Sequence, residues 1–445
     1  MIDLNAQYRA LLTTPAAAAA MIPDGARVAL ALGAGAPPLL LHALADGARA
    51  GAARDIRFYY MLCTAIVGRT IFDPQLTDRL IPMSYFHSGV ERGLDKGRTQ
   101  SSSDEFIVDY IPSHFSQIPR SMVEHVGVDT LIATVSPMDD EGFFSLGTNT
   151  DYAMAVARKP GARLILEVNR HMPRVRGDCR VPLADVAALI EGDTPLCTVP
   201  TAPLSPTDTR IGEIIAGLVD DGACLQMGIG ALPDAVCAGL HHHRRLGIHT
   251  ELITPGLAEL VRRGVADNSA KQTHTGTTIF TFALGDRALY DFIDDNPAAQ
   301  AFPVEYVNNP AVIARNDRVV SVNATTQVDF HGACNSEFVA GRQFSGTGGQ
   351  VDFVRGAYMS AGGKSIIACH STAAGGTISR ITPRLSGPVT TSRNDTHLVV
   401  TEYGVADMKG KTLAERAQAL IAIAHPDFRE DLYREAHALR LAGHD

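Results

Sequence analysis

Glu251 closes a short apolar run, residues 246–252, which follows a glycine loop at Gly228, Ile229 and Gly230. A carboxylate at the end of a strand can attack an acyl group if nearby N–H groups stabilise the negative charge that develops on the attacked carbonyl. The glycine loop would supply such groups, because glycine leaves the backbone unshielded. These features predict a site that binds a thioester and attacks it with Glu251.

Several other segments could either belong to a site or have only a structural role. The glycine-rich residues 346–353, which include Gly349, could supply oxyanion N–H groups or form a tight structural turn. Asn308 precedes Asn-Pro, which is typical of a turn, but its amide could also orient a carboxylate. Glu402 is either an acid at a helix entry or a pocket group. For Glu251, spacing alone favours a solvated surface glutamate, and its polar neighbours and the turn that follows favour a site.

Several common signatures of catalysis and cofactor binding are missing. The glycine loops at residues 33–35 and 228–230 lack the third glycine of a dinucleotide-binding motif. Residues 410–412 resemble the end of a phosphate-binding loop, but the preceding glycine stands one residue too far away. The sequence contains neither a GxSxG motif nor a CxxC pair. We therefore expect a carboxylate nucleophile and no metal.

Composition limits the possible architectures and partners. The 445 residues, 45% of them hydrophobic, are too many for one ordinary core and enough for two. A formal charge of -9 argues against nucleic acid or an anionic membrane as a partner. The 7 cysteines are scattered and predict reduced, mostly buried thiols. The sequence shows neither a basic leader nor a bilayer-length apolar run, so we expect a cytoplasmic location.

An internal repeat predicts the fold. Residues 24–38 are echoed by residues 221–233, and each copy reads as a strand, a glycine turn and a helix start with proline in its first turn. A stretch rich in proline and hydroxyl groups separates them, so we predict domains at 1–198 and 210–445 joined by a linker at 199–209. Each domain should be an α/β unit with a mainly parallel sheet flanked by helices. The predicted strands are 129–135, 163–167, 319–322, 365–368 and 397–401, and the predicted closing helices are 413–423 and 428–441.

Motifs spread over nearly the whole chain resemble one family. They are residues 135–139, 147–152, 167–174, 228–230, 348–353, 392–395, 401–406 and 423–429. Together they are similar to the acetyl-CoA hydrolase/transferase family of glutamate-dependent CoA-transferases. The resemblance implies two related CoA-transferase domains, with the N-terminal domain on the side of the acceptor acid and the C-terminal domain carrying the catalytic glutamate and the CoA loops.

The resemblance also assigns roles to residues. It implies that Glu251 attacks an acyl-CoA to give an acyl-glutamyl anhydride and then an enzyme-CoA thioester, and that Asn308 orients groups near the carboxylate. Coenzyme A is then a substrate and a covalent intermediate, and no cofactor is bound permanently. The implied oxyanion and CoA contacts are Gln226, Met227, Gly228, Ile229, Gly230, Gly349, Gly376 and Glu402.

The implied reaction moves CoA from succinyl-CoA or acetyl-CoA to a small carboxylic acid. Residues 59–61 and 144–149 are closer to the branch that handles itaconate, and 4-hydroxybutyrate is the other favoured acceptor. Many relatives carry an acidic residue shortly after the catalytic glutamate, whereas Ile-Thr-Pro-Gly stands here at 253–256. The alternatives are an acyl-CoA hydrolase, a butyrate- or acetate-specific transferase and a CoA-binding scaffold. Relatives suggest a homo-oligomer, with acyl-CoA and the acid as the other partners.

Overall fold

The structure, a computed structural model, describes residues 3–98, 108–200 and 203–441, and the chain divides into two compact units. Unit 1 comprises Met1–Val199 and Phe280–Tyr306, and unit 2 comprises Pro200–Ile279 and Val307–Asp445. The sequence predicted a single crossing at the linker 199–209. The chain instead also crosses after Ile279 and after Tyr306.

Residues 280–306 belong to unit 1 because backbone hydrogen bonds tie them to a segment far away in the sequence. The N–H of Ala283 donates to the carbonyl of Thr148 at 2.8 Å, and the N–H of Thr150 donates to the carbonyl of Thr281 at 3.2 Å. Contacts between such distant segments leave no local pattern, so the predicted boundaries 1–198 and 210–445 omit this return.

The predicted linker 199–209 also includes the start of a helix, α8 (Pro206–Ala216). Ser205 caps this helix, because its hydroxyl accepts a hydrogen bond from the N–H of Asp208 at 3.1 Å. The Asp208 carboxylate accepts in return from the N–H of Ser205 at 3.0 Å. Pro206, one of the prolines in the stretch that suggested a linker, is the first residue of the helix, a position that tolerates proline.

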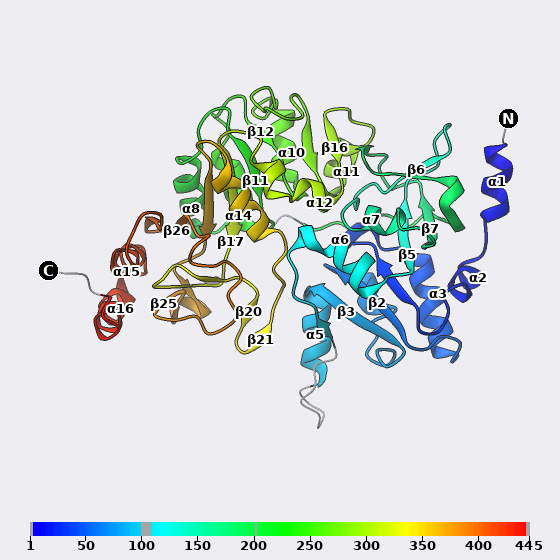
Figure 1. The fold of residues 1–445 in the computed structure, drawn as a ribbon, viewed down its shortest axis with the longest axis horizontal. Coiled ribbons are helices and arrows are strands. Elements are labelled where there is room, and N and C mark those ends of the chain that lie inside the picture. The colour runs from blue at the N-terminus through cyan, green and yellow to red at the C-terminus, as the bar shows by residue number, and fades with distance from the viewer. Residues whose placement is uncertain (1–2, 99–107, 201–202, 442–445) are drawn as a thin grey trace. The chain divides into compact units, whose positions relative to one another are not determined.

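Helices and strands alternate along most of unit 1 (Figure 1). Its strands are β1 (Arg27–Leu30), β2 (Ile56–Met61), β3 (Leu80–Phe86), β4 (Asp109–Tyr110), β5 (Thr130–Val135), β6 (Phe143–Ser145), β7 (Arg163–Asn169), β8 (Arg176–Gly177), β9 (Arg180–Pro182), β10 (Val186–Gly192), β15 (Phe282–Ala283) and β16 (Ala299–Ala301). Its helices are α1 (Leu4–Leu11), α2 (Pro15–Ala20), α3 (Pro38–Arg49), α4 (Ala65–Arg69), α5 (Gly89–Arg98), α6 (Ile118–Arg120), α7 (Ala153–Ala157) and α11 (Arg287–Ile293). The chain crosses between the units within β14 (Thr278–Phe280) and α12 (Val304–Val307).

The main sheet of unit 1 has 7 strands in the order β10-β7-β5-β1-β2-β3-β4, and all neighbouring strands are parallel. Val28, Ala29 and Leu30 of β1 are all buried, as expected of a parallel strand covered on both faces. The strand order reverses between β1 and β5. In sheets of this kind, ligands bind at the carboxyl ends of the strands where the order reverses.

Unit 2 repeats this architecture. Its strands are β11 (Cys224–Met227), β12 (Gly247–Ile248), β13 (Leu252–Ile253), β17 (Val319–Ala324), β18 (Gln327–Asp329), β19 (Cys334–Asn335), β20 (Phe338–Val339), β21 (Arg342–Gln343), β22 (Lys364–Ala368), β23 (Thr372–Ala373), β24 (Ile378–Ser379), β25 (Ile381–Thr382), β26 (Leu398–Thr401) and β27 (Gly404–Asp407). Besides α8, its helices are α9 (Ala231–Gly239), α10 (Pro255–Arg262), α13 (Pro310–Ile313), α14 (Gln350–Met359), α15 (Leu413–Ala422) and α16 (Pro426–Ala438).

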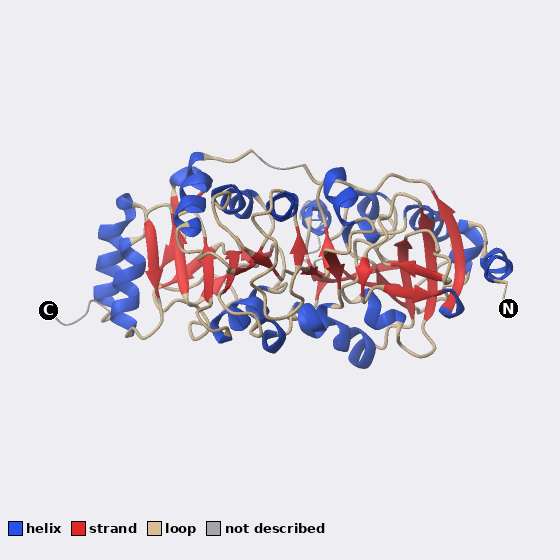
Figure 2. Ribbon diagram, turned by 90° about the horizontal axis from the view of Figure 1, so that it is seen from above, coloured by secondary structure: helices blue, strands red, loops and turns tan. Residues whose placement is uncertain are grey.

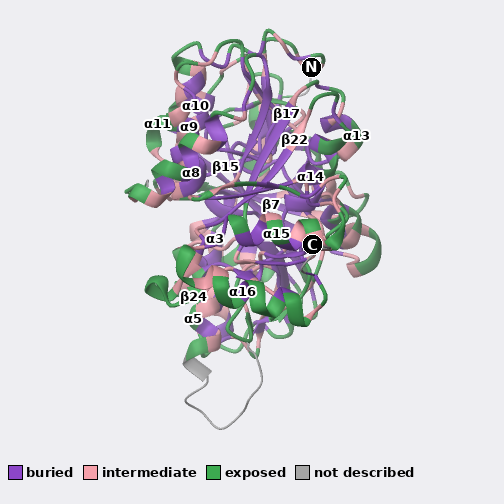
Figure 3. Cartoon of the chain, turned by 90° about the vertical axis from the view of Figure 1, so that its left-hand side faces the viewer, coloured by how far each residue is buried: buried purple, intermediate pink, exposed green. Residues whose placement is uncertain are grey.

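The main sheet of unit 2 has 6 strands in the order β12-β11-β17-β22-β26-β27, of which only the edge strand β27 is antiparallel to its neighbour. Helices cover both faces of the sheets (Figure 2), and the strands β7, β17 and β22 are buried (Figure 3). The prediction of α/β units with mainly parallel sheets flanked by helices is therefore confirmed.

The structure also bears on the sequence's expectations about thiols, membrane spans and metal sites. Five of the 7 cysteines are buried and the other two are partly buried, which confirms the prediction of mostly buried thiols. Within the described ranges, no helix has the length and apolar character needed to cross a bilayer. The same ranges hold no group of 3 or more His, Cys, Asp or Glu side chains arranged for a metal ion.

Glu167 of β7 is a buried carboxyl group that ties the sheet of unit 1 to a helix. Its Oε2 accepts hydrogen bonds from the N–H groups of Leu39 at 2.9 Å and Leu40 at 3.3 Å, in the first turn of α3. Burial raises the pKa of this carboxyl group to about 7, and the two N–H groups oppose the shift only in part.

We expect this carboxyl group to make the protein less stable as the pH rises. The raised pKa means that the folded protein binds more protons than the unfolded chain from roughly pH 4.5 up to about pH 7, so stability falls across this window and then levels off. Glu167→Gln keeps an acceptor and has no charge. The melting temperature of the variant minus that of the unmodified protein should be larger at about pH 8 than at about pH 5.5. Calorimetry of both proteins at both pH values measures this difference. Asp151, whose pKa burial also raises to about 7, is present in both proteins and cancels. The same difference in melting temperature between the two proteins at both pH values would contradict the expectation.

Candidate active site

The carboxyl edge of the unit 2 sheet gathers several of the residues singled out in the sequence. At this edge β11 leads into the loop at residues 228–230, and Glu251 follows β12. Ser371 follows β22, and Glu402 follows β26. This is the edge at which open α/β sheets bind ligands. The fold of unit 2 therefore places the predicted site residues where the architecture expects a site.

Glu251, Asn308 and Gly349 are in direct contact. The Asn308 amide donates from Nδ2 to Glu251 Oε2 at 2.6 Å. A Cβ atom added to Gly349 would overlap both Glu251 Oε2 and Asn308 Nδ2, and it would lie 3.0 Å from Glu251 Cδ. The glycine therefore has no side chain because the carboxylate occupies that space. Spacing alone favoured a solvated Glu251, whereas this carboxylate is partly buried against an amide and a glycine.

Glu251 lies just outside the sheet rather than within a strand. The run 246–252, predicted as one strand, is divided into β12 and β13, with Glu251 in the bend between them. The N–H of His249 still bonds to the carbonyl of Leu225 at 3.1 Å, but the Thr250 hydroxyl donates to the carbonyl of Leu252 at 3.0 Å and closes a local turn. The prediction of a continuous strand was wrong because a short hydroxyl side chain bonds the nearby backbone here.

Gly349 stands at the start of α14, and a side-chain amide holds that end of the helix in place. Gln350 donates from Nε2 to the hydroxyls of Ser336 at 3.0 Å and Thr391 at 2.8 Å. The amino end of a helix carries partial positive charge from its unpaired N–H groups. Glu251 contacts Gly349 in that field, which would favour an oxyanion formed there.

The loop at residues 228–230 is the more open of the two copies of the glycine repeat. Ile229 is 51% exposed, and no described atom lies within 4 Å of a Cβ built on Gly230, whose φ is 117°. In the first copy, residues 33–35 are buried, and a Cβ on Gly35 would overlap the Asn149 amide. The second copy alone presents its backbone at the surface of its unit.

Gln226 and Met227 end β11 directly before this loop, and both are buried. The Gln226 amide forms a reciprocal pair with Asn323 on the neighbouring strand β17, in which Asn323 Nδ2 donates to Gln226 Oε1 at 3.2 Å and Gln226 Nε2 donates to Asn323 Oδ1 at 3.4 Å. Met227 is 1% exposed. Both side chains are thus buried at the end of the strand that leads into the loop.

Glu402 and Gly376 are not brought to Glu251. Glu402 accepts hydrogen bonds from the N–H of Ser371 at 2.9 Å and from its hydroxyl at 2.6 Å. Its strand β26 is the fourth neighbour of β12 in the sheet, which corresponds to roughly 19 Å at the usual spacing of strands. Gly376 lies in an exposed turn between β23 and β24 with a φ of 92°. A ligand that touched Glu251 and Glu402 together would have to be long.

Sequence reasoning counted His249 only as a polar neighbour that favours a site at Glu251, and assigned it no role of its own. Its side chain is 1% exposed, and its Nε2 lies 2.8 Å from the carbonyl of Val307. Burial, together with the charge of Lys271, lowers the pKa of this imidazole to about 3, so the ring is neutral. The polar residue within an apolar run was visible in the sequence, but its partner Val307 is 58 residues away and leaves no local signal.

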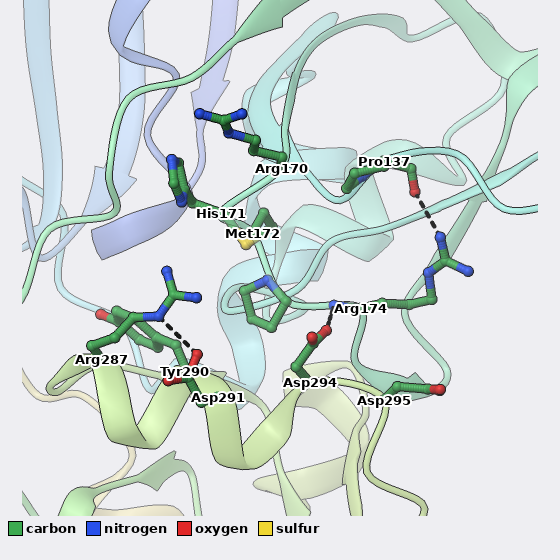
Figure 4. A pocket seen from close by; sticks show the side chains of 11 residues that line it. Pro137, Arg170, His171, Met172, Arg174, Arg287, Tyr290, Asp291, Asp294 and Asp295 are labelled. Carbon is green, nitrogen blue, oxygen red and sulfur yellow. Dashed lines mark hydrogen bonds and ion pairs between the residues drawn. The ribbon is translucent and has the colours of Figure 1, made fainter.

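A large pocket in unit 1 is not a candidate for the active site. This pocket, about 320 Å³, is formed by the 170–174 turn, α11 and the residues after it (Figure 4). Arg287 pairs with Asp291 at 2.7 Å, and the backbone N–H of Arg174 donates to Asp294 Oδ1 at 2.7 Å. Three arginines and three aspartates line it, so it has no clear preference for an anion.

Comparisons with known proteins match domains of the same family in both units. Residues 2–200 match the acetyl-CoA hydrolase/transferase N-terminal domain, and residues 285–436 match the C-terminal domain of that name. The chain is 40% identical to succinyl-CoA:cyclohexane-1-carboxylate CoA transferase of Geobacter metallireducens, over 97% of this chain and 96% of the relative. It is 46% identical to 4-hydroxybutyrate coenzyme A transferase of Clostridium kluyveri, over 76% of this chain and 80% of the relative. The crystal structure of RipA from Yersinia pestis superposes with a TM-score of 0.96 at 48% identity, covering 99% of this chain and 100% of RipA.

Proposed function

The chain belongs to the acetyl-CoA hydrolase/transferase family and is a CoA-transferase, and from this premise we propose that Glu251 carries CoA as a covalent thioester during turnover. The donor is succinyl-CoA or acetyl-CoA, and the acceptor is a small carboxylic acid. The observation that carries the proposal is the contact of Glu251 with the Asn308 amide and with Gly349 at the start of α14.

The proposed reaction has two matched halves. Glu251 attacks the donor thioester carbonyl, the C–S bond breaks, and CoA leaves as a thiolate with an acyl-glutamyl anhydride behind it. The thiolate attacks the glutamyl carbonyl, releases the donor acid as a carboxylate and forms the Glu251-CoA thioester. The acceptor carboxylate then attacks this thioester and expels the thiolate. The thiolate attacks the acyl carbonyl of the new anhydride, which yields the acceptor's CoA ester and restores the Glu251 carboxylate.

Each tetrahedral step places negative charge on an oxygen, which a site must stabilise. We assign that role to the backbone N–H groups of Ile229 and Gly349. The Asn308 amide holds Glu251 Oε2 at 2.6 Å, which orients the carboxylate for attack. The exposure of Ile229 and the missing side chain of Gly349 support this assignment, because both leave the backbone open to a ligand.

The remaining predicted contacts suit the long arm of CoA. Gly228 and Gly230 are assigned to CoA near the thioester, with Gln226 and Met227 supporting them, and Gly376 and Glu402 to its distant end. The separation of roughly 19 Å between the strands that precede Glu251 and Glu402 fits an extended substrate.

Truncated substrates should therefore lose rate as well as affinity. Binding of a remote part of a substrate can be used to lower the barrier at the reacting bond. We expect an acyl-pantetheine with the donor's acyl group to react with a kcat at least about 100-fold lower than the CoA ester. Steady-state kinetics with both thioesters measure the effect. An equal kcat with a raised KM would show that the arm contributes only to binding.

We place the acceptor acid in unit 1, as the resemblance implies. A pocket of about 120 Å³ lies where the strand order of the unit 1 sheet reverses, and it has hydroxyl and amide groups from Thr64, Thr134, Asn169 and Thr194. Itaconate and 4-hydroxybutyrate are the favoured acceptors, and the name of one relative supports the second. Butyrate or acetate is the alternative. A panel of short acids assayed with succinyl-CoA and acetyl-CoA ranks them by kcat/KM, and comparable rates for all acids would remove the case for a specific acceptor.

The second candidate function is acyl-CoA hydrolysis, which the family name includes. It differs only in that water reaches the Glu251-CoA thioester before an acid does. Release of free CoA measured with and without acceptor separates the two functions. Fast release that ignores the acceptor would favour the hydrolase. We also propose a cytoplasmic homo-oligomer, for which light scattering of the purified protein provides the mass.

A further inference from the structure

His249 contacts both segments that complete the surroundings of Glu251. It stands two residues before Glu251 in the chain, and its imidazole Nε2 lies 2.8 Å from the carbonyl oxygen of Val307. Val307 directly precedes Asn308, whose amide holds the Glu251 carboxylate at 2.6 Å. The imidazole therefore links the backbone on either side of the Asn308 contact.

The chemistry of this contact fixes the state of the ring. A carbonyl oxygen accepts hydrogen bonds, so Nε2 must carry the proton and donate it. The ring is neutral because burial and the charge of Lys271 keep its pKa far below neutrality. Its Nδ1 is buried without a hydrogen-bond partner among the described residues. Only one of the two ring nitrogens is thus used, and it is used to hold Val307.

The His249 ring also contacts α14. The rings of His249 and Phe353 lie with their centroids 6.3 Å apart and their planes at 58°. The N–H of Phe353 donates to the carbonyl of Gly349 at 3.1 Å, so the ring packs against the first turn of the helix that begins beside Glu251. Lys271 Nζ donates to the carbonyl of Ile248, the residue before His249, at 2.9 Å.

We infer that His249 is a positioning residue for the proposed transfer: its Nε2–H holds the Val307 carbonyl and thereby sets the Asn308 amide against Glu251. This inference rests on the proposed role of Glu251. Without the donor, a buried carbonyl loses its partner and the Asn308 segment can shift, which would leave Glu251 less well oriented. The loss should fall on kcat, because His249 acts through the carboxylate and not through contact with CoA.

The test compares replacements that differ in one property. His249→Gln places an amide N–H close to the position of Nε2, whereas His249→Asn has the same amide on a shorter arm that falls short of Val307. His249→Phe keeps the ring that packs on Phe353 and removes the donor. We expect the Asn and Phe variants to lose about 10- to 100-fold in kcat, with KM for acyl-CoA within about threefold, and the Gln variant to recover most of the loss.

His397, at the amino end of a strand in the same sheet, provides a matched control. His397 directly precedes β26, accepts a hydrogen bond at Nδ1 from the N–H of Ser365 at 3.4 Å and packs on the ring of Tyr358. His397→Phe should leave kcat within about twofold even where it lowers the melting temperature. A histidine that only stabilised the fold would behave like this control, so equal kcat values for His249→Asn and His249→Gln would overturn the inference.

A double-mutant cycle with Asn308→Ala tests the proposed route of the effect. If His249 acts through Asn308, then His249→Asn should cost little further kcat once the Asn308 amide is gone. Losses that multiply would overturn the inference. Transfer by the unmodified protein and its Glu251-CoA thioester are measured in the same series. Failure to form that thioester would remove the proposed function, whereas failure of the cycle alone would remove only the role of His249.

Discussion

Glu251→Gln should lower kcat for CoA transfer by about 10⁴-fold or more, because the variant has no carboxylate to form the anhydride. Losses of this size follow removal of a nucleophile that takes part in a covalent mechanism. The glutamine side chain has the same length, and it leaves Gly349 and Asn308 in place, so the change removes the reacting oxygen and little else. Initial rates of acyl-CoA formation with purified protein provide the measurement.

The matched control for this change is another glutamate of unit 2. Glu213 of α8 is 60% exposed in its side chain and pairs with Arg210 at 3.4 Å. Glu213→Gln should leave kcat unchanged within about twofold, as expected of a surface substitution away from a site. Glu251→Asp keeps the charge but withdraws it by one methylene, so we expect a loss of roughly 100-fold. A Glu251→Gln protein that transferred CoA at the normal rate would rule out the nucleophile assigned here.

Gly349→Ala should produce the second largest loss, about 100- to 1000-fold in kcat. The added Cβ would overlap Glu251 Oε2 and Asn308 Nδ2, so the carboxylate and the amide must move apart or the start of α14 must shift. Displacement of a reacting group by about 1 Å can cost roughly 100-fold, and loss of an oxyanion donor costs a similar or larger factor. The φ of Gly349 is -96°, so alanine strains the contact and not the backbone.

Gly217, an exposed residue at the end of α8, provides the matched glycine. A Cβ there would meet only ordinary contacts, the nearest being the carbonyl of Ile214 at 3.5 Å. Gly217→Ala should therefore keep full activity. Melting temperatures of both variants show whether either protein has lost its fold. If Gly349→Ala retained full kcat with a normal melting temperature, the crowding around Glu251 would not matter for the reaction.

Much of the fold could be predicted because its signals are local. The apolar run 224–227 and the glycine loop after it became β11 and the turn before α9 within the predicted bounds. The predicted strand 319–322 and helix 413–423 also formed, as β17 and α15. Glycine turns and β-branched runs are readable in one sequence because they depend on neighbouring residues.

What could not be predicted depends on contacts between distant segments. Asn308 is 57 residues from Glu251, and no spacing rule joins them; the family resemblance selected both. The return of residues 280–306 to unit 1 rests on pairing with residues near 150, and the Gln226 amide found its partner in Asn323, 97 residues away. The bend at Glu251 depends on a single hydroxyl bond of Thr250, which competes with the strand.

The most direct test of the central claim is mass spectrometry of the protein after exposure to acyl-CoA without an acceptor. Peptides are mapped with and without borohydride, which reduces a glutamyl thioester to an alcohol. The proposed mechanism predicts a modification on the peptide that contains Glu251, its absence in Glu251→Gln, and its removal when an acceptor acid is added before the borohydride. An active enzyme that carries no adduct at Glu251, or carries it on another residue, would contradict the mechanism.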